Sequence, residues 1–146
     1  LPLPTRVIAQ EPTREEKNHD ALTRRQKILL VDDEDVVRNL IKGVLTDEPA
    51  DILEAADGTE ALNIFREQHA AIDLVILDMI MPGIKGDEVL REMRNIRKDV
   101  KIIISSGYMS EDQRESLKKH KVDGFLDKPF RDKDVIHKII EVLSKK

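Results

Sequence analysis

Acidic side chains stand directly after two short apolar runs of this chain, where they could bind a cation. Asp78 follows the apolar run 74–77, and Asp32 and Asp33 follow the run 28–31. Carboxylates that share one pocket repel one another, so such a cluster is costly unless a cation lies among them. Oxygen ligands with no histidine or cysteine nearby favour Mg²⁺. The pattern therefore predicts a magnesium site, provided that the runs are neighbouring strands.

A lysine and two serines stand at similar positions later in the chain. Ser105 and Ser106 end the run 101–106, and Lys128 follows the run 122–126. A cation, an ammonium group and a hydroxyl can together hold three phosphoryl oxygens while a carboxylate oxygen attacks phosphorus in line. We therefore expect phosphorylation of Asp78, assisted by Lys128 and a serine hydroxyl.

The apolar runs alternate with helical patterns, and this alternation predicts how the polar residues are positioned. The predicted strands cover 28–31, 51–56, 73–78, 101–106 and 122–126. Five strands alternating with five helices favour a doubly wound α/β fold, with a parallel sheet covered on both faces. The carboxyl ends of all five strands then share one edge, which is where open α/β sheets bind ligands.

Two of the predicted helices differ in how much apolar surface they offer. The helix expected over 110–120 has Leu117 as almost its only apolar residue, so it should be the least firmly held. The last helix has a wide stripe, and part of it could face a partner such as a second copy in a homodimer. The stripe consists of Val135, Ile136, Ile139, Ile140 and Leu143.

Composition bounds the class of protein. The chain has 146 residues, which suits one domain, and its net charge of −4 argues against a general binder of nucleic acid or of anionic membranes. No apolar run approaches the length of a membrane span, and no signal-peptide pattern is present. The absence of cysteine is compatible with the cytoplasm, where we expect the protein to work.

The amino-terminal part has a different composition from the rest. Residues 1–26 contain three of the six prolines, carry mixed charges and lack a continuous apolar stripe. We expect a linker or amino-terminal extension over 1–26 and a single domain over 27–146. The alternative is that 1–26 continues a helix from an upstream domain.

Four motifs resemble those of response-regulator receiver domains. They are L-L-V-D-D-E at 29–34, L-D-M-I-M-P-G at 77–83, I-I-S-S-G-Y at 103–108 and G-F-L-D-K-P-F at 124–130. All four stand in order at predicted strand ends, and the similarity runs from Lys27 to the carboxyl terminus. The resemblance implies the flavodoxin-like five-stranded fold with strand order 2-1-3-4-5.

The resemblance also implies roles for individual residues. Asp78 would accept a phosphoryl group from a phosphohistidine on a histidine kinase or a histidine phosphotransfer domain. Asp32, Asp33 and Asp78 would hold Mg²⁺, together with the backbone carbonyl of Ile80. Lys128 would contact the phosphoryl group, and its bond to the following proline is typically cis in the family. Such a domain assists its own phosphorylation and dephosphorylation.

A switch is implied by the same resemblance. Ser106, which precedes a small residue, resembles the hydroxyl that moves toward the new phosphoryl group. Phe125 stands where family members often carry a tyrosine, so any coupling through its ring would act by packing alone. The surface formed by the helix over 110–120, the fifth strand and the last helix would change.

The same residues also allow other interpretations. The acids over 32–35 could be only the favourable first turn of a helix. A flavodoxin-like module needs a phosphate-cradling loop rich in Ser, Thr or Gly after the first strand, but D-D-E-D stands there. A haloacid-dehalogenase-like phosphatase needs a second aspartate two residues after its nucleophile, but Ile80 occupies that position. A degenerate receiver used only for binding would lack site residues that are present here.

The first residues suggest a larger parent protein. The opening L-P-L-P resembles the end of a histidine-kinase ATP-binding domain. A linker followed by a terminal receiver would suit a hybrid histidine kinase, in which case the parent protein would be an enzyme.

Overall fold

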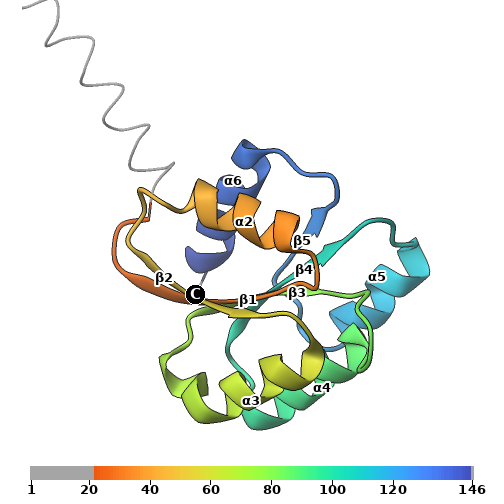
Figure 1. The fold of residues 1–146 in the computed structure, drawn as a ribbon. Helices are drawn as coiled ribbons and strands as arrows, with labels where there is room; N and C mark the ends of the chain where they lie inside the picture. The colour runs from red at the N-terminus through yellow and green to blue at the C-terminus, as the bar shows by residue number, and fades with distance from the viewer. Residues whose placement is uncertain (1–21, 146) are drawn as a thin grey trace, which may run out of the picture.

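A five-stranded parallel sheet forms the centre of the computed structural model, which describes residues 22–145 (Figure 1). The strands are β1 (Gln26–Val31), β2 (Ala50–Ala55), β3 (Leu74–Asp78), β4 (Lys101–Ser106) and β5 (Gly124–Asp127). All neighbouring pairs are parallel, and the order is β2-β1-β3-β4-β5. The predicted fold class and strand order are confirmed.

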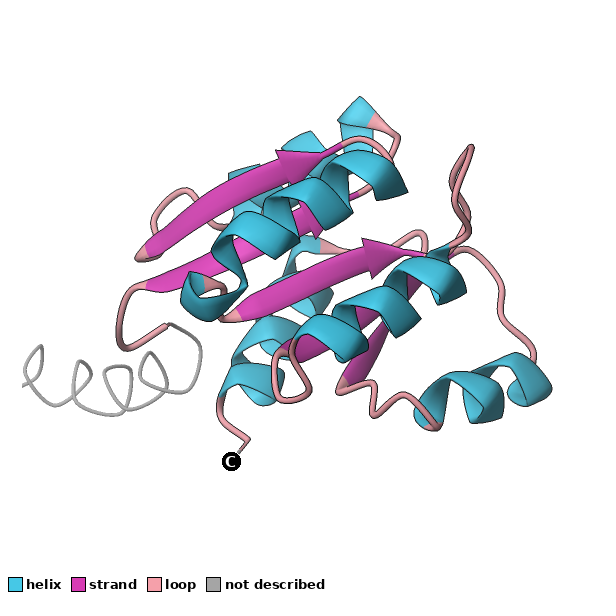
Figure 2. Cartoon of the chain, turned by 90° about the horizontal axis from the view of Figure 1, so that it is seen from below, coloured by secondary structure: helices cyan, strands magenta, loops and turns pink. Residues whose placement is uncertain are grey.

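Helices cover both faces of the sheet. They are α2 (Asp35–Val44), α3 (Gly58–Gln68), α4 (Gly86–Ile96), α5 (Glu111–Lys118) and α6 (Asp132–Leu143), with a short 3₁₀ turn, η1, at His69–Ala71. Figure 1 shows α2 and α6 above the sheet, α3 and α4 below it and α5 at the right; Leu117 of α5 packs in the same cluster as α3 and α4. Figure 2, turned by a quarter rotation, shows the strand arrows pointing the same way. Their carboxyl ends therefore lie at one edge.

Alternation along the strands divides the core into two layers. In β3, Leu74 and Ile76 pack with α2 and α6, whereas Val75 and Leu77 pack with α3 and α4. Every residue of β3 is buried, including Asp78 at its end. A strand covered on both faces has no need of polar residues, which explains the unbroken apolar run in the sequence.

Strand boundaries differ from the predicted ones by one or two residues. β1 begins at Gln26, whose N–H donates to the carbonyl of Pro49 at 2.8 Å. β5 ends at Asp127, which pairs with Ser106 across the sheet and which an apolar pattern could not include. The residues just before β5 are not part of the strand. There the N–H of Ile102 donates to the Asp123 carboxylate at 2.8 Å rather than to a backbone carbonyl. Pairing with a neighbour decides these ends.

α5 and α6 differ in how much of their surface is buried within the domain. Leu117 is the only buried residue of α5, as the sequence predicted. In α6, Val135, Ile139 and Val142 are buried, and Ile136 and Leu143 pack against the same cluster. The wide stripe of α6 is thus used largely within the domain, because this helix packs on α2 as well as on the sheet. A homodimer through this helix stays a prediction.

The beginning of the described chain is already attached to the domain. The N–H of Leu22 donates to Glu48 at 2.8 Å, and Arg25 pairs with Asp51 at 3.0 Å. Residues 1–21 of the predicted linker lie outside the described part.

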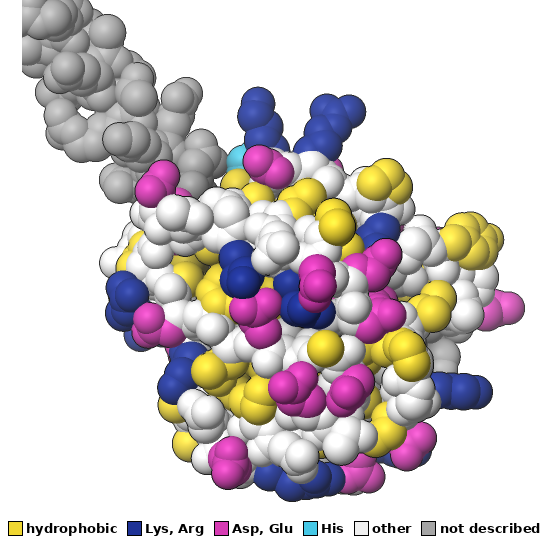
Figure 3. Space-filling view, in the orientation of Figure 1, with side chains coloured by type: hydrophobic (Ala, Val, Ile, Leu, Met, Phe, Trp, Pro, Cys, Tyr) yellow, Lys and Arg dark blue, Asp and Glu magenta, His cyan; other side chains and the backbone are white. Residues whose placement is uncertain are grey.

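The surface carries mixed charge. On the face shown in Figure 3, basic and acidic side chains are interspersed over α2 and the neighbouring sheet edge. Among residues 22–145, no helix has the length and apolar character needed to cross a membrane.

Candidate functional site

Three carboxylates meet at the sheet edge. Asp78 is the last residue of β3, and Asp32 and Asp33 follow β1, the neighbouring strand. One carboxylate oxygen from each lies within 4.8 Å of the others. Asp32 and Asp78 are only 1% and 2% exposed, whereas Asp33 is exposed. The register of β1 with β3 aligns Val31 with Leu77, so the two following acids are adjacent.

Lys128 lies among these carboxylates. Its Nζ is 3.0 Å from Oδ2 of Asp32, 3.5 Å from Oδ2 of Asp78 and 3.4 Å from Oε1 of Glu34. Burial acts to lower the pKa of Lys128, but the hydrogen bond to Asp32 and the charges of Asp78, Asp32 and Glu34 outweigh it and raise that pKa. The backbone places the lysine, because its N–H donates to the carbonyl of Ser106 at 2.6 Å. The bond from Lys128 to Pro129 is cis.

The pKa of Asp78 is raised to about 6. Burial is the main cause, and the nearby charge of Asp32 acts in the same direction. The N–H of Ile80, which donates to Asp78 Oδ1 at 3.1 Å, and the ammonium of Lys128 oppose this shift. One lysine therefore does not compensate the buried carboxylates fully. Two buried carboxylates whose charge is only partly compensated favour the binding of an additional cation.

The donor set fits a divalent metal ion such as Mg²⁺. All three side chains offer oxygen, which is what a hard cation requires. Asp32 Oδ1 also accepts the N–H of Glu34 at 2.9 Å, which fixes the direction of that carboxylate. Ile80 follows Asp78 in the loop with 71% of its surface exposed, and its N–H is engaged as described above. Its carbonyl stays a predicted ligand.

The loop after Asp78 depends on a glycine. The N–H of Gly86 donates to the carbonyl of Met79 at 3.3 Å where α4 begins. A Cβ on Gly86 would lie 2.6 Å from Cα and 2.8 Å from the carbonyl oxygen of Met79, which is backbone and cannot rotate away. Glycine at this position therefore allows α4 to approach the residue that follows Asp78.

The two serines at the end of β4 have different surroundings. Ser106 is buried, and its hydroxyl donates to the carbonyl of Tyr108 at 3.4 Å. Ser105 pairs with Asp78 in the sheet register, and its buried hydroxyl has no hydrogen-bond partner among the described residues. The two serines point to opposite faces of the sheet because successive strand residues alternate.

Phe125 stands on β5, on the face of the sheet that α3, α4 and α5 cover. The ring is half-buried and packs against the core of that face. The guanidinium of Arg114, from α5, lies 4.8 Å from the ring centroid and also pairs with Asp127 at 2.5 Å. Sequence reasoning did not identify Arg114 as a neighbour of Phe125.

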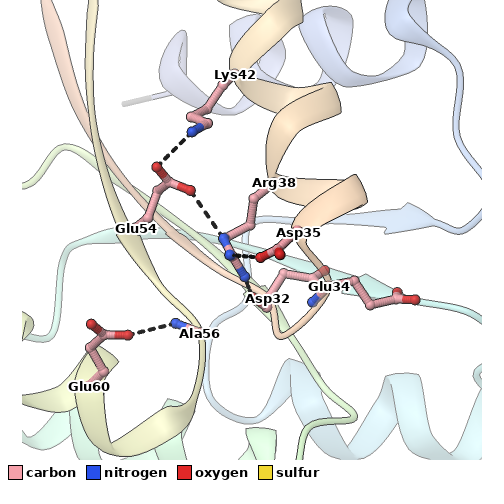
Figure 4. A network of polar contacts seen from close by, with 8 residues as sticks. All are labelled: Asp32, Glu34, Asp35, Arg38, Lys42, Glu54, Ala56 and Glu60. Carbon is pink, nitrogen blue, oxygen red and sulfur yellow. Dashed lines mark hydrogen bonds and ion pairs between the residues drawn. The ribbon is translucent and has the colours of Figure 1, made fainter.

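Arg38 and Glu34 are two further residues at the site that sequence reasoning missed. Arg38 donates to the carbonyl of Asp32 at 2.6 Å and to Glu54 at 3.1 Å, and it contacts Asp35 (Figure 4). The spacing of Arg38 from Asp35 by three residues in a predicted helix was the available signal. Glu54 lies on β2, and no local pattern in the sequence links it to Arg38.

Known proteins resemble this chain in sequence. Residues 28–141 match the family described as response regulator receiver domain. The chain is 36% identical over 138 residues to the sensor kinase CckA of Brucella abortus, which covers 94% of this chain and 14% of that protein. It is 32% identical over 119 residues to the chemotaxis protein CheY of Halobacterium salinarum, covering 82% of this chain and 98% of that protein.

Coverage of the relatives varies widely. Besides 14% of the sensor kinase, the chain spans 50% of a probable transcriptional regulator, ycf27, of Porphyridium aerugineum. It therefore corresponds to only a part of such proteins.

Solved structures resemble it as well. The receiver domain of the hybrid histidine kinase CckA shares 36% identity at a TM-score of 0.68, covering 81% of this chain and 99% of that chain. A complex of CheX and CheY with BeF3 and Mg from Borrelia burgdorferi matches at 26% identity and a TM-score of 0.78, covering 82% and 90%. From its fold, its acidic edge and these matches, the chain belongs to the response regulator receiver domains, which are phosphoacceptor signalling domains.

Proposed function

We propose that Asp78 is the phosphoacceptor and that Mg²⁺ binds beside it. Asp32, Asp33, Asp78 and the backbone carbonyl of Ile80 would hold the ion. The observation that carries this proposal is the clustering of three carboxylates within 4.8 Å, with Lys128 3.5 Å from Asp78. When bound, the ion supplies positive charge that holds a phosphoryl oxygen and offsets carboxylate repulsion.

The transfer step follows from the positions of the side chains. An oxygen of Asp78 attacks phosphorus, the bond from phosphorus to the partner's histidine nitrogen breaks, and its electron pair stays on that nitrogen, which takes a proton from solvent to give neutral imidazole. Lys128 holds a phosphoryl oxygen with its ammonium group, so charge is stabilised without proton transfer from the protein. Hydrolysis of the acyl phosphate by water later returns Asp78 and releases inorganic phosphate.

The response would involve Ser106 and Phe125. Ser106 donates only a long hydrogen bond of 3.4 Å, so little is lost if its hydroxyl turns to a phosphoryl oxygen. Movement of Ser106 would open space for the ring of Phe125, and the change would spread to the surface of α5, β5 and α6. Support for α5 as the moving element is its single buried residue, Leu117.

An apolar surface beside the site suits a histidine-bearing partner. A pocket of about 470 Å³ is lined by Val36, Val37 and Leu40 of α2 together with Lys128, Pro129, Phe130, Glu34 and Gly107. Val36 is 77% exposed. Because this surface includes Lys128, a partner bound here would hold its phosphohistidine next to Asp78. We call it the α2 surface.

The parent protein is proposed to be a hybrid histidine kinase. The similarity to the CckA sensor kinase covers 94% of this chain, so it extends beyond the receiver match at 28–141 into the amino-terminal segment. The opening L-P-L-P agrees with a kinase domain upstream. A receiver that is supplied by an ATP-dependent kinase would work in the cytoplasm. The family matched is that of receiver domains, and the match gives no support to a flavodoxin-like or phosphatase module.

Intact mass spectrometry with acetyl phosphate tests the proposal. We expect one phosphoryl adduct on the wild type with Mg²⁺, and no adduct with EDTA or in Asp78→Asn. Asp99→Asn, which changes an exposed aspartate far from the site in sequence, is the matched control and should be labelled like the wild type. An adduct that persists in Asp78→Asn would overturn the assignment of the acceptor.

A second assay covers a failure with the small donor. If acetyl phosphate labels nothing, the chain is incubated with its phosphorylated cognate histidine kinase or phosphotransfer domain. Absence of transfer in both assays would show that Asp78 is not a working acceptor.

A further inference from the structure

The side chain of Arg38 links the acidic loop to the neighbouring strand β2. Arg38 lies in the first turns of α2, and only 14% of its side chain is exposed. Its guanidinium donates to the backbone carbonyl of Asp32 at 2.6 Å and to Oε1 of Glu54 at 3.1 Å, and it also contacts Asp35. Figure 4 shows these groups gathered around one planar cation. An arginine has enough donors in a fixed fork to bind several acceptors at once.

The carbonyl that Arg38 holds belongs to the peptide between two proposed metal ligands. The carbonyl of Asp32 and the N–H of Asp33 lie in one rigid peptide plane. Orienting that carbonyl therefore orients the start of Asp33 as well as the end of Asp32. Arg38 therefore binds the peptide group that joins the two residues whose carboxylates are the proposed ligands.

Asp32 is held by other contacts on its remaining sides. Its N–H donates to the carbonyl of Ala55 at 3.1 Å, which continues the pairing of β1 with β2. Its carboxylate accepts the N–H of Glu34 at 2.9 Å and lies 3.0 Å from Lys128. The hydrogen bond from Arg38 additionally fixes the carbonyl of Asp32, which belongs to the peptide group leading to Asp33. Asp33 is exposed and has the least packing to define its direction.

The acids of the loop that follows β1 have different basic partners. Four acids follow one another at 32–35, and any of them could compete for one cation. Asp35 pairs with Arg38, whereas Glu34 lies 3.4 Å from Lys128. In Figure 4 the carboxylate of Asp35 lies beside the guanidinium and that of Glu34 points away from it. The pairing with Arg38 therefore engages Asp35, whereas Glu34 shares Lys128 with Asp32 and Asp78.

We propose that Arg38 is a positioning residue for the metal site: by holding the carbonyl of Asp32 it directs the carboxylates of Asp32 and Asp33 and so strengthens Mg²⁺ binding, despite its own positive charge. This inference rests on the proposed function, because it assumes that these carboxylates bind the ion.

The sign of the effect distinguishes positioning from simple charge. A nearby cation repels Mg²⁺, so removal of a positive charge should tighten binding if only Coulomb interactions matter. Loss of positioning should weaken binding, because groups that orient metal ligands typically contribute 10- to 100-fold in affinity. The two explanations therefore predict opposite changes when Arg38 is replaced.

Lys42 offers a matched control. Its Nζ pairs with Glu54 at 2.8 Å, on the same carboxylate that Arg38 contacts, and it lies on the same helix. No hydrogen bond from Lys42 to Asp32 is present among the described contacts. Lys42→Met therefore removes the same charge and the same Glu54 partner but leaves the carbonyl of Asp32 held.

Calorimetric titration of the full 146-residue chain with MgCl₂ measures the affinity directly. We expect Lys42→Met to bind Mg²⁺ as tightly as the wild type or slightly more tightly. Arg38→Met should bind about tenfold more weakly. Arg38→Lys keeps the charge but cannot reach three acceptors, so it too should bind several-fold more weakly.

The outcomes separate the two proposals. A wild type that binds no Mg²⁺ contradicts the proposed function itself. A wild type that binds while Arg38→Lys and Arg38→Met bind equally well or better overturns the positioning role and leaves the proposed function intact. Urea unfolding of each variant checks that it is folded, and if Arg38→Met does not fold, the comparison of Arg38→Lys with the wild type decides.

Discussion

Asp78 has a carboxylate whose charge is costly to bury but is needed for its proposed role as acceptor. Burial of the Asp78 carboxylate disfavours its charged form and raises its pKa to about 6. The side chain remains only 3% exposed, and Lys128 at 3.5 Å offsets the cost in part. We infer that the unmodified site reduces the stability of the domain at neutral pH.

Replacing Asp78 by Asn should therefore stabilise the metal-free domain at pH 7. The folded pKa of about 6 lies above the value of 3.8 for a free carboxyl, so the folded state binds more protons between these values. Stability of the wild type then falls as pH rises from about 4 to about 6 and stays low above that. The gain in free energy of unfolding for Asp78→Asn should be on the order of 2 kcal/mol at pH 7 and should shrink toward pH 4.

Urea unfolding in EDTA at a series of pH values measures this difference. Equal stability of the variant and the wild type at pH 7 would show that burial does not penalise the Asp78 carboxylate.

At the scale of elements, α5 is held by few contacts. Besides Leu117, it is attached through Arg114, which lies over Phe125 and pairs with Asp127. The carbonyls of His120 and Lys121, just after the helix, accept hydrogen bonds from Arg94 at 2.7 Å each. The carboxyl end of α5 is thus fixed to α4, and its middle depends largely on Arg114.

Arg114→Met should loosen α5 without unfolding the domain. Loss of a cation–π contact worth about 1 kcal/mol should speed amide hydrogen exchange in α5 about fivefold. Lys118→Met, which removes only an exposed pair with Glu115 from the same helix, is the control and should change exchange little. If both variants exchange alike, Arg114 does not restrain the helix.

The start of α4 should tolerate no side chain at Gly86. Gly86→Ala places a Cβ against the backbone of Met79, and we expect it to lower the free energy of unfolding by about 1–3 kcal/mol. Gly43→Ala is the matched control, because nothing lies within 4 Å of its Cβ in α2 and alanine favours the helix by up to about 1 kcal/mol. Urea denaturation should give opposite signs. A neutral Gly86→Ala would mean that the loop after Asp78 can shift freely.

At the scale of the whole molecule, two pockets lie beside the edge of the sheet that carries the carboxylates. The α2 surface adjoins Lys128, while a second pocket, of about 400 Å³, lies on the α5 side among Met79, Met81 and Met109. In our proposal the partner docks on the α2 surface, and the responding surface of α5, β5 and α6 includes elements from both faces of the sheet, because α6 packs with α2. The site at the strand ends is shared by both.

Val36→Asp should impair phosphotransfer from a histidine-bearing partner at least tenfold, because a charge at the centre of an apolar contact must be desolvated. Labelling by acetyl phosphate should be unchanged, since it needs no docking. Thr59→Asp adds the same charge to α3 on the other face and should leave both reactions unaffected. Rates of transfer followed by intact mass would contradict the α2 surface if Val36→Asp matched Thr59→Asp.

The sequence by itself determined the class of fold and the carboxylates that meet at the sheet edge. Unbroken apolar runs ending in Asp78 or in Asp32 and Asp33 are local features, because a doubly covered strand must be apolar until it reaches the sheet edge. The weak anchoring of α5 was also visible, since it depends on one apolar residue within that segment.

Only the tertiary structure decided the contacts between segments distant in the chain. The length of β5 follows from pairing with β4, and the burial of the α6 stripe follows from packing on α2. The link from Arg38 to Glu54 and the raised pKa of Asp78 likewise depend on what neighbouring strands bring to one point. Local patterns record which face of an element is buried, but they do not record which partner buries it.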